Sequence, residues 1–222
     1  MAEILQISNL NKSYKHDIVL NNISLQLQEG KIYGLIGTNG AGKTTLIKAI
    51  LGFIKYTGKI SISDRVSALS YVPEIIKFYD YLTGLQAVKL ITSLQGQDID
   101  QVIKNFHEKA QKIDYFDHNK LIKQHSKGNL RKLMLLQAFS VNTDLIILDE
   151  PFSGLDPLVT TKLNYLFEEK KQTGATILLS THLFEMAKKI CDVLIFIKNG
   201  NILDVINKEK YENIKLIDIF HK

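Results

Sequence analysis

The sequence of 222 residues predicts an α/β fold with a mainly parallel central sheet, and three observations carry this prediction. Apolar runs at 32–36, 145–148 and 176–180 have the length of strands and are typical of strands buried on both faces. Segments with the residue spacing of helices follow these runs. Near the N-terminus, apolar and polar residues alternate over 22–27, which indicates antiparallel strands laid against the main sheet.

The elements of the first third follow from the same patterns. Strands are expected at 4–10 and 22–27, with a polar turn over 11–16 between them. The helix after the third strand is expected to bury one apolar face, formed by Leu46, Ile47, Ile50 and Leu51. Two further short strands are expected at 58–62 and 68–72.

From about residue 80 to 139 no strand pattern is visible, and we expect an inserted helical subdomain. Its helical spacing is seen in two apolar sets, Val88, Ile91 and Leu94, then Val102, Ile103 and Phe106. A polar turn over 124–129 opens the last helix of this stretch. The chain 1–222 is therefore predicted to be one domain, with its core and antiparallel strands in about 1–79 and 140–222.

The last third predicts two helices and a hairpin. Asp156-Pro157 is a favourable helix start, because the carboxylate can cap the helix and proline suits its first position. A helix is expected after His182, and the turn at Asn199-Gly200 predicts a hairpin over 193–205. The last fifteen residues show no informative pattern.

Composition narrows the class of protein. The chain is 45% hydrophobic and 23% charged, as in soluble globular proteins, and no window approaches 18 uninterrupted apolar residues. With no secretory signal visible and a single cysteine, Cys191, a reducing cytoplasm is expected. The net charge of +5 comes from scattered lysines, so no nucleic-acid partner is expected.

A glycine-rich segment joins the expected strand at 32–36 to the following helix. It runs Gly37-Thr38-Asn39-Gly40-Ala41-Gly42-Lys43-Thr44. Glycines let backbone N–H groups turn towards a phosphate, and a helix N-terminus favours an anion. Lys43 is placed to reach the β- and γ-phosphates and the Thr44 hydroxyl to hold Mg²⁺. The pattern predicts a nucleoside triphosphate site; a merely flexible glycine loop is the alternative.

Two carboxylates follow the apolar run at 145–148. Ligands of open α/β sheets bind at the carboxyl ends of strands, where Asp149 and Glu150 are expected to lie. Asp149 is placed to hold Mg²⁺, and Glu150 to polarise a water that attacks the γ-phosphate. An ordinary acidic strand end is the alternative for this pair.

The order of the motifs over almost the whole chain resembles the ATP-binding subunit of an ABC transporter, in particular those of bacterial exporters. The segment 37–44 matches the Walker A motif and 145–151 the Walker B motif. Ser153-Gly154-Leu155-Asp156-Pro157 resembles the D-loop, and Ser180-Thr181-His182 the switch-histidine loop. The resemblance implies a RecA-like P-loop NTPase core and transport-coupled ATP hydrolysis, with ATP and Mg²⁺ as cofactors.

The resemblance also implies roles for individual residues. ATP would be bound by Tyr14, Gly37, Thr38, Asn39, Gly40, Ala41, Gly42, Lys43, Thr44 and Thr45 of one copy, and by Ser126 and Gly128 of a second copy. The catalytic residues would be Glu150, His182 and Lys43. Mg²⁺ would be held by Thr44, Glu74 and Asp149. Tyr14 would stack on adenine; an ordinary half-exposed strand residue is its alternative, as a satisfied core histidine is for His182.

The implied partners are a second ATP-binding subunit, in a head-to-tail homodimer around two MgATP, and an integral membrane permease. The permease would dock near Glu74 and the helical stretch, which places the chain in the cytoplasm, peripherally on the inner face of the cell membrane. The motif forms incline towards export.

Two motifs depart from the family pattern. The signature, commonly Leu-Ser-Gly-Gly-Gln, is His125-Ser126-Lys127-Gly128-Asn129 here, and Lys127 is expected to face solvent. Glu74 stands where the family usually has a glutamine, and its negative charge should slow turnover by repelling the γ-phosphate. Two alternative functions therefore remain: a soluble ABC ATPase outside transport, and an ATP-gated scaffold that hydrolyses weakly.

Overall fold

A six-stranded sheet with the strand order β5-β6-β7-β3-β8-β9 forms the centre of the computed structural model, which describes residues 2–213 and 216–220. The strands are β3 (Ile32–Ile36), β5 (Leu69–Val72), β6 (Leu145–Asp149), β7 (Thr176–Thr181), β8 (Val193–Lys198) and β9 (Asn201–Asn207). Neighbouring strands pair in parallel except β8 and β9, which form the expected antiparallel hairpin. The predicted mainly parallel sheet is confirmed.

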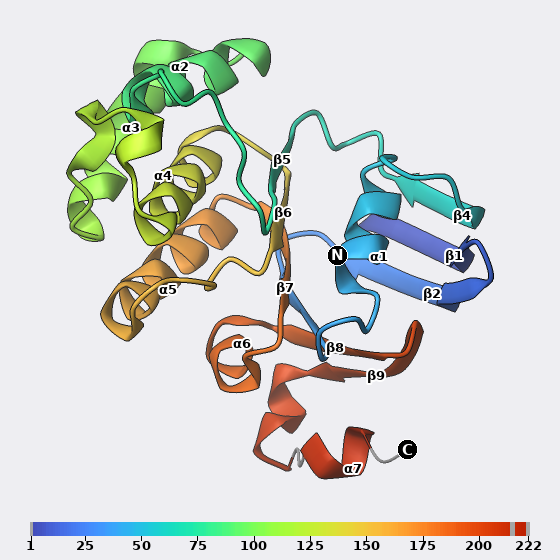
Figure 1. Ribbon diagram of the computed structural model, residues 1–222. Coiled ribbons are helices and arrows are strands. Elements are labelled where there is room, and N and C mark those ends of the chain that lie inside the picture. The colour runs from blue at the N-terminus through green and yellow to red at the C-terminus, as the bar shows by residue number, and fades with distance from the viewer. Residues whose placement is uncertain (1, 214–215, 221–222) are drawn as a thin grey trace.

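The central sheet is buried on both faces, which explains its unbroken apolar runs. Alternate residues of β6 face opposite sides: Ile146 and Leu148 belong to one hydrophobic core, Leu145 and Ile147 to the other. All four are fully buried. The first core packs the sheet against helices, and the second packs it against the N-terminal strands, as Figure 1 shows.

The N-terminal strands form a separate antiparallel sheet with the order β2-β1-β4, also as predicted. Its strands are β1 (Glu3–Tyr14), β2 (Asp17–Gln28) and β4 (Thr57–Ile62). The turn predicted over 11–16 is wrong, because β1 continues to Tyr14 and only Lys15 and His16 turn the chain. Polar side chains there face water while their backbone still pairs with β2, as Ser13 does with Ile18.

The helices that the structure describes are α1 (Lys43–Ile50), α2 (Gly84–Leu94), α3 (Ile99–Lys112), α4 (Lys127–Ser140), α5 (Pro157–Gln172), α6 (Phe184–Ile190) and α7 (Leu216–Phe220). Short 3-10 turns lie at Asp117–Asn119, Ile122–Gln124 and Lys208–Asn213. Helices α2 to α5 lie on one side of the central sheet, and α1 lies with the antiparallel sheet on the other (Figure 1). The division into subdomains at about residues 80 and 139 stays a prediction.

Two helices begin where the sequence predicted. Ser126 caps α4 by accepting a hydrogen bond from the Asn129 N–H, and Asp156 caps α5 by accepting from the Val159 N–H. Helix α2 buries Val88 but leaves Leu94, a residue of the same apolar set, 79% exposed. Two steps of three residues turn a helix about 120° away from its starting direction, so Leu94 leaves the buried stripe.

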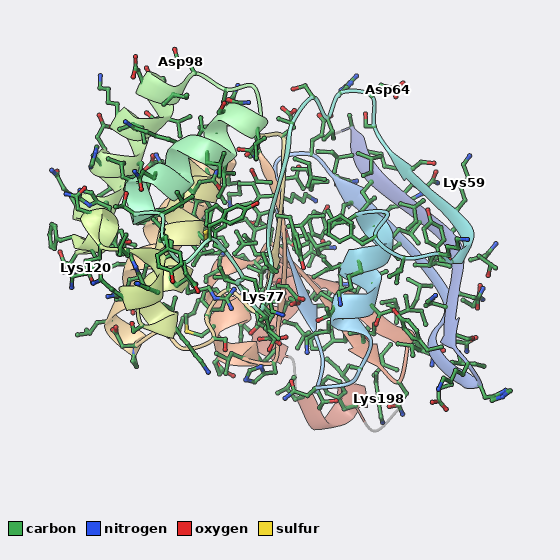
Figure 2. The ribbon with its side chains drawn as sticks, turned by 45° about the horizontal axis from the view of Figure 1, so that its top comes forward. Lys59, Asp64, Lys77, Asp98, Lys120 and Lys198 are labelled. Carbon is green, nitrogen blue, oxygen red and sulfur yellow. The ribbon has the colours of Figure 1, made fainter. Side chains whose placement is uncertain are left out.

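Figure 2 shows the side chains of the two halves, with Asp98 and Lys120 marking the helical half, Lys59 the antiparallel sheet and Asp64 the turn after β4. Among the described residues, no helix is long and apolar enough to cross a bilayer.

Candidate functional site

The glycine-rich loop folds around the side chain of Lys43. The Lys43 Nζ donates to the carbonyl oxygens of Gly37 at 2.8 Å and of Thr38 at 3.2 Å. It also lies 3.3 Å from Glu150 Oε1, and both side chains are less than a tenth exposed. The lysine therefore joins the glycine-rich loop to the end of strand β6.

Two glycines of this loop are required by its geometry. A Cβ at Gly37 would lie 2.5 Å from the carbonyl oxygen of Ile197, which is closer than real Cβ contacts allow. Gly42, the residue that caps α1, has φ 107°, a left-handed conformation that strains other residues. The neighbouring sheet and the turn into α1 thus force glycine at both positions.

A cavity of about 550 Å³ opens at the N-terminus of α1. Its lining residues are Val19, Asn39, Gly40, Ala41, Gly42, Lys43, Thr44, Thr45, Glu74 and Glu150. The free N–H groups of a helix start, with a lysine beside them, favour an anion such as a phosphate. Glu74 and Glu150 bring carboxylates to the same cavity, as the sequence predicted for a triphosphate site with a metal.

Ser180 holds the carboxyl end of strand β6. Its hydroxyl donates to Asp149 Oδ1 at 2.5 Å and accepts from the Glu150 N–H at 3.0 Å. Ser180 and Asp149 are almost completely buried. Glu150 has φ 47°, an uncommon conformation for a non-glycine residue, and the bond to Ser180 helps to fix it.

The Glu150 carboxylate lies between a lysine and a histidine. Its Oε1 faces Lys43, and its Oε2 lies 3.0 Å from His182 Nδ1. His182 is half-exposed at the tip of β7, whereas Glu150 is buried. The structure thus brings Lys43, Glu150 and His182, three residues predicted to be catalytic, into one chain of contacts.

The described residues fit a magnesium ion. Asp149 Oδ2 is a buried carboxylate oxygen without a hydrogen-bond partner in the described part of the chain. No group of three or more His, Cys, Asp or Glu side chains among these residues forms a metal cage. Mg²⁺ suits such a place, because it is held by one or two carboxylates together with substrate phosphates.

Burial raises the pKa of Tyr71 to about 12, and the nearby charge of Asp149 adds to this increase, so the Tyr71 hydroxyl stays protonated.

The signature segment lies at the start of α4, outside the cavity lining. The Ser126 hydroxyl is used as the helix cap, and a Cβ at Gly128 would lie 2.7 Å from the Gly154 carbonyl oxygen. Lys127 is exposed, as predicted. The start of α4 therefore packs closely on the loop before α5 and turns its lysine to solvent.

Two of the three residues that depart from the usual signature bond inwards. His125 contacts the Tyr115 hydroxyl through Nε2 and the Leu121 carbonyl through Nδ1, each at 2.9 Å. Asn129 Nδ2 donates to Asp117 Oδ2 at 2.5 Å. These departures from the usual signature anchor it to the preceding segment and leave Ser126 at the surface.

Tyr14 is one of the predicted nucleotide-binding residues that lie outside the cavity lining. Its ring is 45% exposed at the end of β1, and the Lys12 Nζ lies 4.6 Å from the ring centroid. Gly37 and Thr38 also stand outside the lining, where their carbonyls hold Lys43.

Sequence reasoning missed the roles of Val19 and Ser180. Val19 lines the cavity from strand β2, and no local pattern marks a valine for such a position. Ser180 could have been found, because a serine at the end of a buried strand needs a hydrogen-bond partner and its neighbour His182 was already singled out.

A parallel sheet with a glycine-rich loop, a buried lysine and paired carboxylates at its carboxyl edge defines a P-loop nucleoside triphosphatase. The family model described as "ABC transporter" matches residues 20–153 of this chain. An uncharacterized ABC transporter ATP-binding protein, YthP of Bacillus subtilis (strain 168), is 38% identical, covering 100% of this chain and 97% of the relative. The chain belongs to the ABC transporter family, and within that family it is an ATP-binding, ATP-hydrolysing subunit.

Other similar proteins agree with this assignment. The lantibiotic transport ATP-binding protein SrtF of Streptococcus pyogenes is 30% identical, covering 98% of this chain and 96% of the relative. A solved ATP-binding subunit of an ABC transporter superposes with a TM-score of 0.87 at 28% identity, covering 98% of both chains. A post-hydrolysis dimer of an ATP-binding cassette with ADP and Pi has the same fold, with a TM-score of 0.82 at 21% identity, covering 92% and 99%.

Proposed function

We propose that two copies of this chain close head to tail around two MgATP and drive a separate membrane permease. The chain of contacts from Lys43 through Glu150 to His182 at the edge of the cavity carries this proposal. Each ATP would be held by 37–45 of one copy, with Tyr14 at the adenine, and by Ser126 and Gly128 of the other.

The residues of the site suggest how hydrolysis proceeds. Glu150 would take a proton from a water whose oxygen bonds to the γ-phosphorus. The bond from that phosphorus to the bridging oxygen then breaks, and ADP keeps the electron pair. Lys43 would leave the loop carbonyls for the phosphate oxygens, and His182 would orient the γ-phosphate.

Mg²⁺, when bound, would offset the charge of the phosphate oxygens. Thr44 and Asp149 would hold it, with Glu74 nearby; the buried Oδ2 of Asp149 supports this assignment.

The permease would dock beside Glu74. Large apolar side chains are exposed just after it: Ile75 at 72%, Tyr79 at 68% and Tyr81 at 77%. Exposed apolar groups of this kind mark binding surfaces for other proteins. With a permease bound there, the chain would lie on the cytoplasmic face of the membrane, and export is the direction we favour.

Steady-state ATP hydrolysis tests the proposed function. We expect Mg²⁺-dependent activity whose specific rate rises with protein concentration, because each site needs two copies. A specific rate independent of concentration, in a protein that stays monomeric with ATP, would contradict the shared site. Co-purification with a multi-span membrane protein is the matching test of the permease.

A second candidate, an ATP-gated scaffold with slow hydrolysis, is favoured by one observation. Glu74 lines the cavity with Glu150, so two carboxylates would face the γ-phosphate. Assays with and without membranes separate the two functions, because a scaffold would stay slow in both.

A further inference from the structure

The side chain of Arg131 connects helix α4 to the segment that carries Glu74. Its Nη1 donates to the Pro73 carbonyl at 2.6 Å, and its Nη2 donates to the Glu74 carbonyl. Only 4% of the residue is exposed. One guanidinium therefore fixes two consecutive carbonyls from two different nitrogens, a geometry that its planar fork allows.

The surroundings of Arg131 are acidic. Burial lowers the pKa of its guanidinium, and the carboxylates of Glu74, Asp149 and Glu150 oppose that effect. The Nε is buried without a hydrogen-bond partner among the described residues. A charge buried this deeply is costly unless opposite charges offset it, and these three carboxylates are the site's own.

Arg131 also stands one turn from the signature. Helix α4 begins at Lys127, so Ser126, Gly128 and Arg131 belong to one rigid element. The guanidinium of Arg131 contacts Glu74, a residue that lines the nucleotide cavity. The helix that would touch the partner's ATP is thus attached to the wall of the site that holds this chain's own ATP.

We propose that Arg131 is a positioning residue that ties the signature helix to the Glu74 segment. The inference deepens the proposed function and rests on it. When a second copy's ATP moves the start of α4, Arg131 carries that displacement to Pro73 and Glu74.

The choice of residue supports a specific role. The chain uses lysine for 26 of its 28 basic residues, and Arg131 is one of only two arginines. A buried position that donates to two consecutive carbonyls suits the planar fork of a guanidinium.

The test compares Arg131→Gln and Arg131→Lys with the wild-type chain. We expect Arg131→Gln to lower kcat about 30-fold, while ADP affinity by calorimetry changes less than about 3-fold. Arg131→Lys should fall between wild type and Arg131→Gln, because its ammonium keeps the charge and N–H donors but places them on a single nitrogen.

A matched control is Lys104→Gln, which removes an exposed cation from the helical half and should leave kcat unchanged. The inference is overturned if Arg131→Gln keeps the wild-type kcat, or if ADP affinity falls in parallel with kcat. It is equally overturned if Arg131→Lys is no better than Arg131→Gln. A wild-type chain without ATPase activity would instead overturn the proposed function, and this inference with it.

Discussion

The two ends of the proposed site are built differently. At the glycine-rich loop, Lys43, Asp149 and Glu150 are buried and bonded to one another or to Ser180. At the start of α4, Ser126 is exposed and its hydroxyl only caps the helix. The buried side chains at the glycine-rich loop have their hydrogen-bond and ion-pair partners within one chain. The start of α4 presents groups that do not line the cavity of its own chain. The difference is what a site shared between two copies requires.

The largest expected effect comes from breaking the buried end. Lys43→Ala should lower kcat about 1000-fold and weaken nucleotide binding, because the main cation of the loop is lost. Lys48→Ala, an exposed lysine on the same helix, is the control and should keep both. An active Lys43→Ala chain in a steady-state assay would show that the buried end is not the phosphate site.

The next effect concerns Ser180, which holds Asp149 and Glu150 together. Ser180→Ala should lower kcat about 100-fold through misplaced carboxylates, while ADP affinity by calorimetry stays close to wild type. Ser140→Ala also removes a buried hydroxyl hydrogen bond, to Leu136, and should not change kcat. Equal losses in the two variants would mean that Ser180 matters only for packing.

The contacts at the far end of α4 should make the stability of the protein depend on pH, and nucleotide should not change this effect. Lys170 donates to the Val141 carbonyl, and burial, helped by the charge of Lys109, lowers its pKa to about 8. The unfolded chain, with a lysine pKa of about 10.4, binds more protons between these values, so this group makes stability rise with pH there. From pH 7 to pH 9.5, wild type should gain about 2 kcal/mol more than Lys170→Met in urea unfolding. A parallel pH dependence in the two proteins would contradict the assignment.

The smallest expected effect concerns the exposed end, at the start of α4. Asn129→Ala removes the hydrogen bond to Asp117 and should weaken ATP-driven dimerisation about 5-fold, or about 1 kcal/mol, in a Glu150→Gln background. ADP binding to the monomer should not change. Sedimentation velocity with ATP measures dimerisation, and calorimetry measures ADP binding to the monomer. A change in both quantities would contradict the difference between the two ends.

Much of the buried end could be predicted from sequence, because its chemistry lies in contiguous motifs. Strand periodicity and the glycine spacing were enough to place Lys43 and Asp149 at the same sheet edge. The contacts of Arg131 and Ser180 join segments about 57 and 31 residues apart, and no local pattern encodes such pairs. The turn at 11–16 was misplaced because backbone pairing with β2 continues through this polar segment to Tyr14, which the polarity of its side chains does not reveal.

The central claim is that a second copy completes the site. Glu150→Gln should bind ATP without hydrolysing it, because the base is lost while Lys43 and the glycine-rich loop remain. Sedimentation velocity of this variant with Mg²⁺ and ATP is the most direct measurement. We expect a dimer with ATP and a monomer with ADP; a chain that binds ATP and stays monomeric would contradict the shared site.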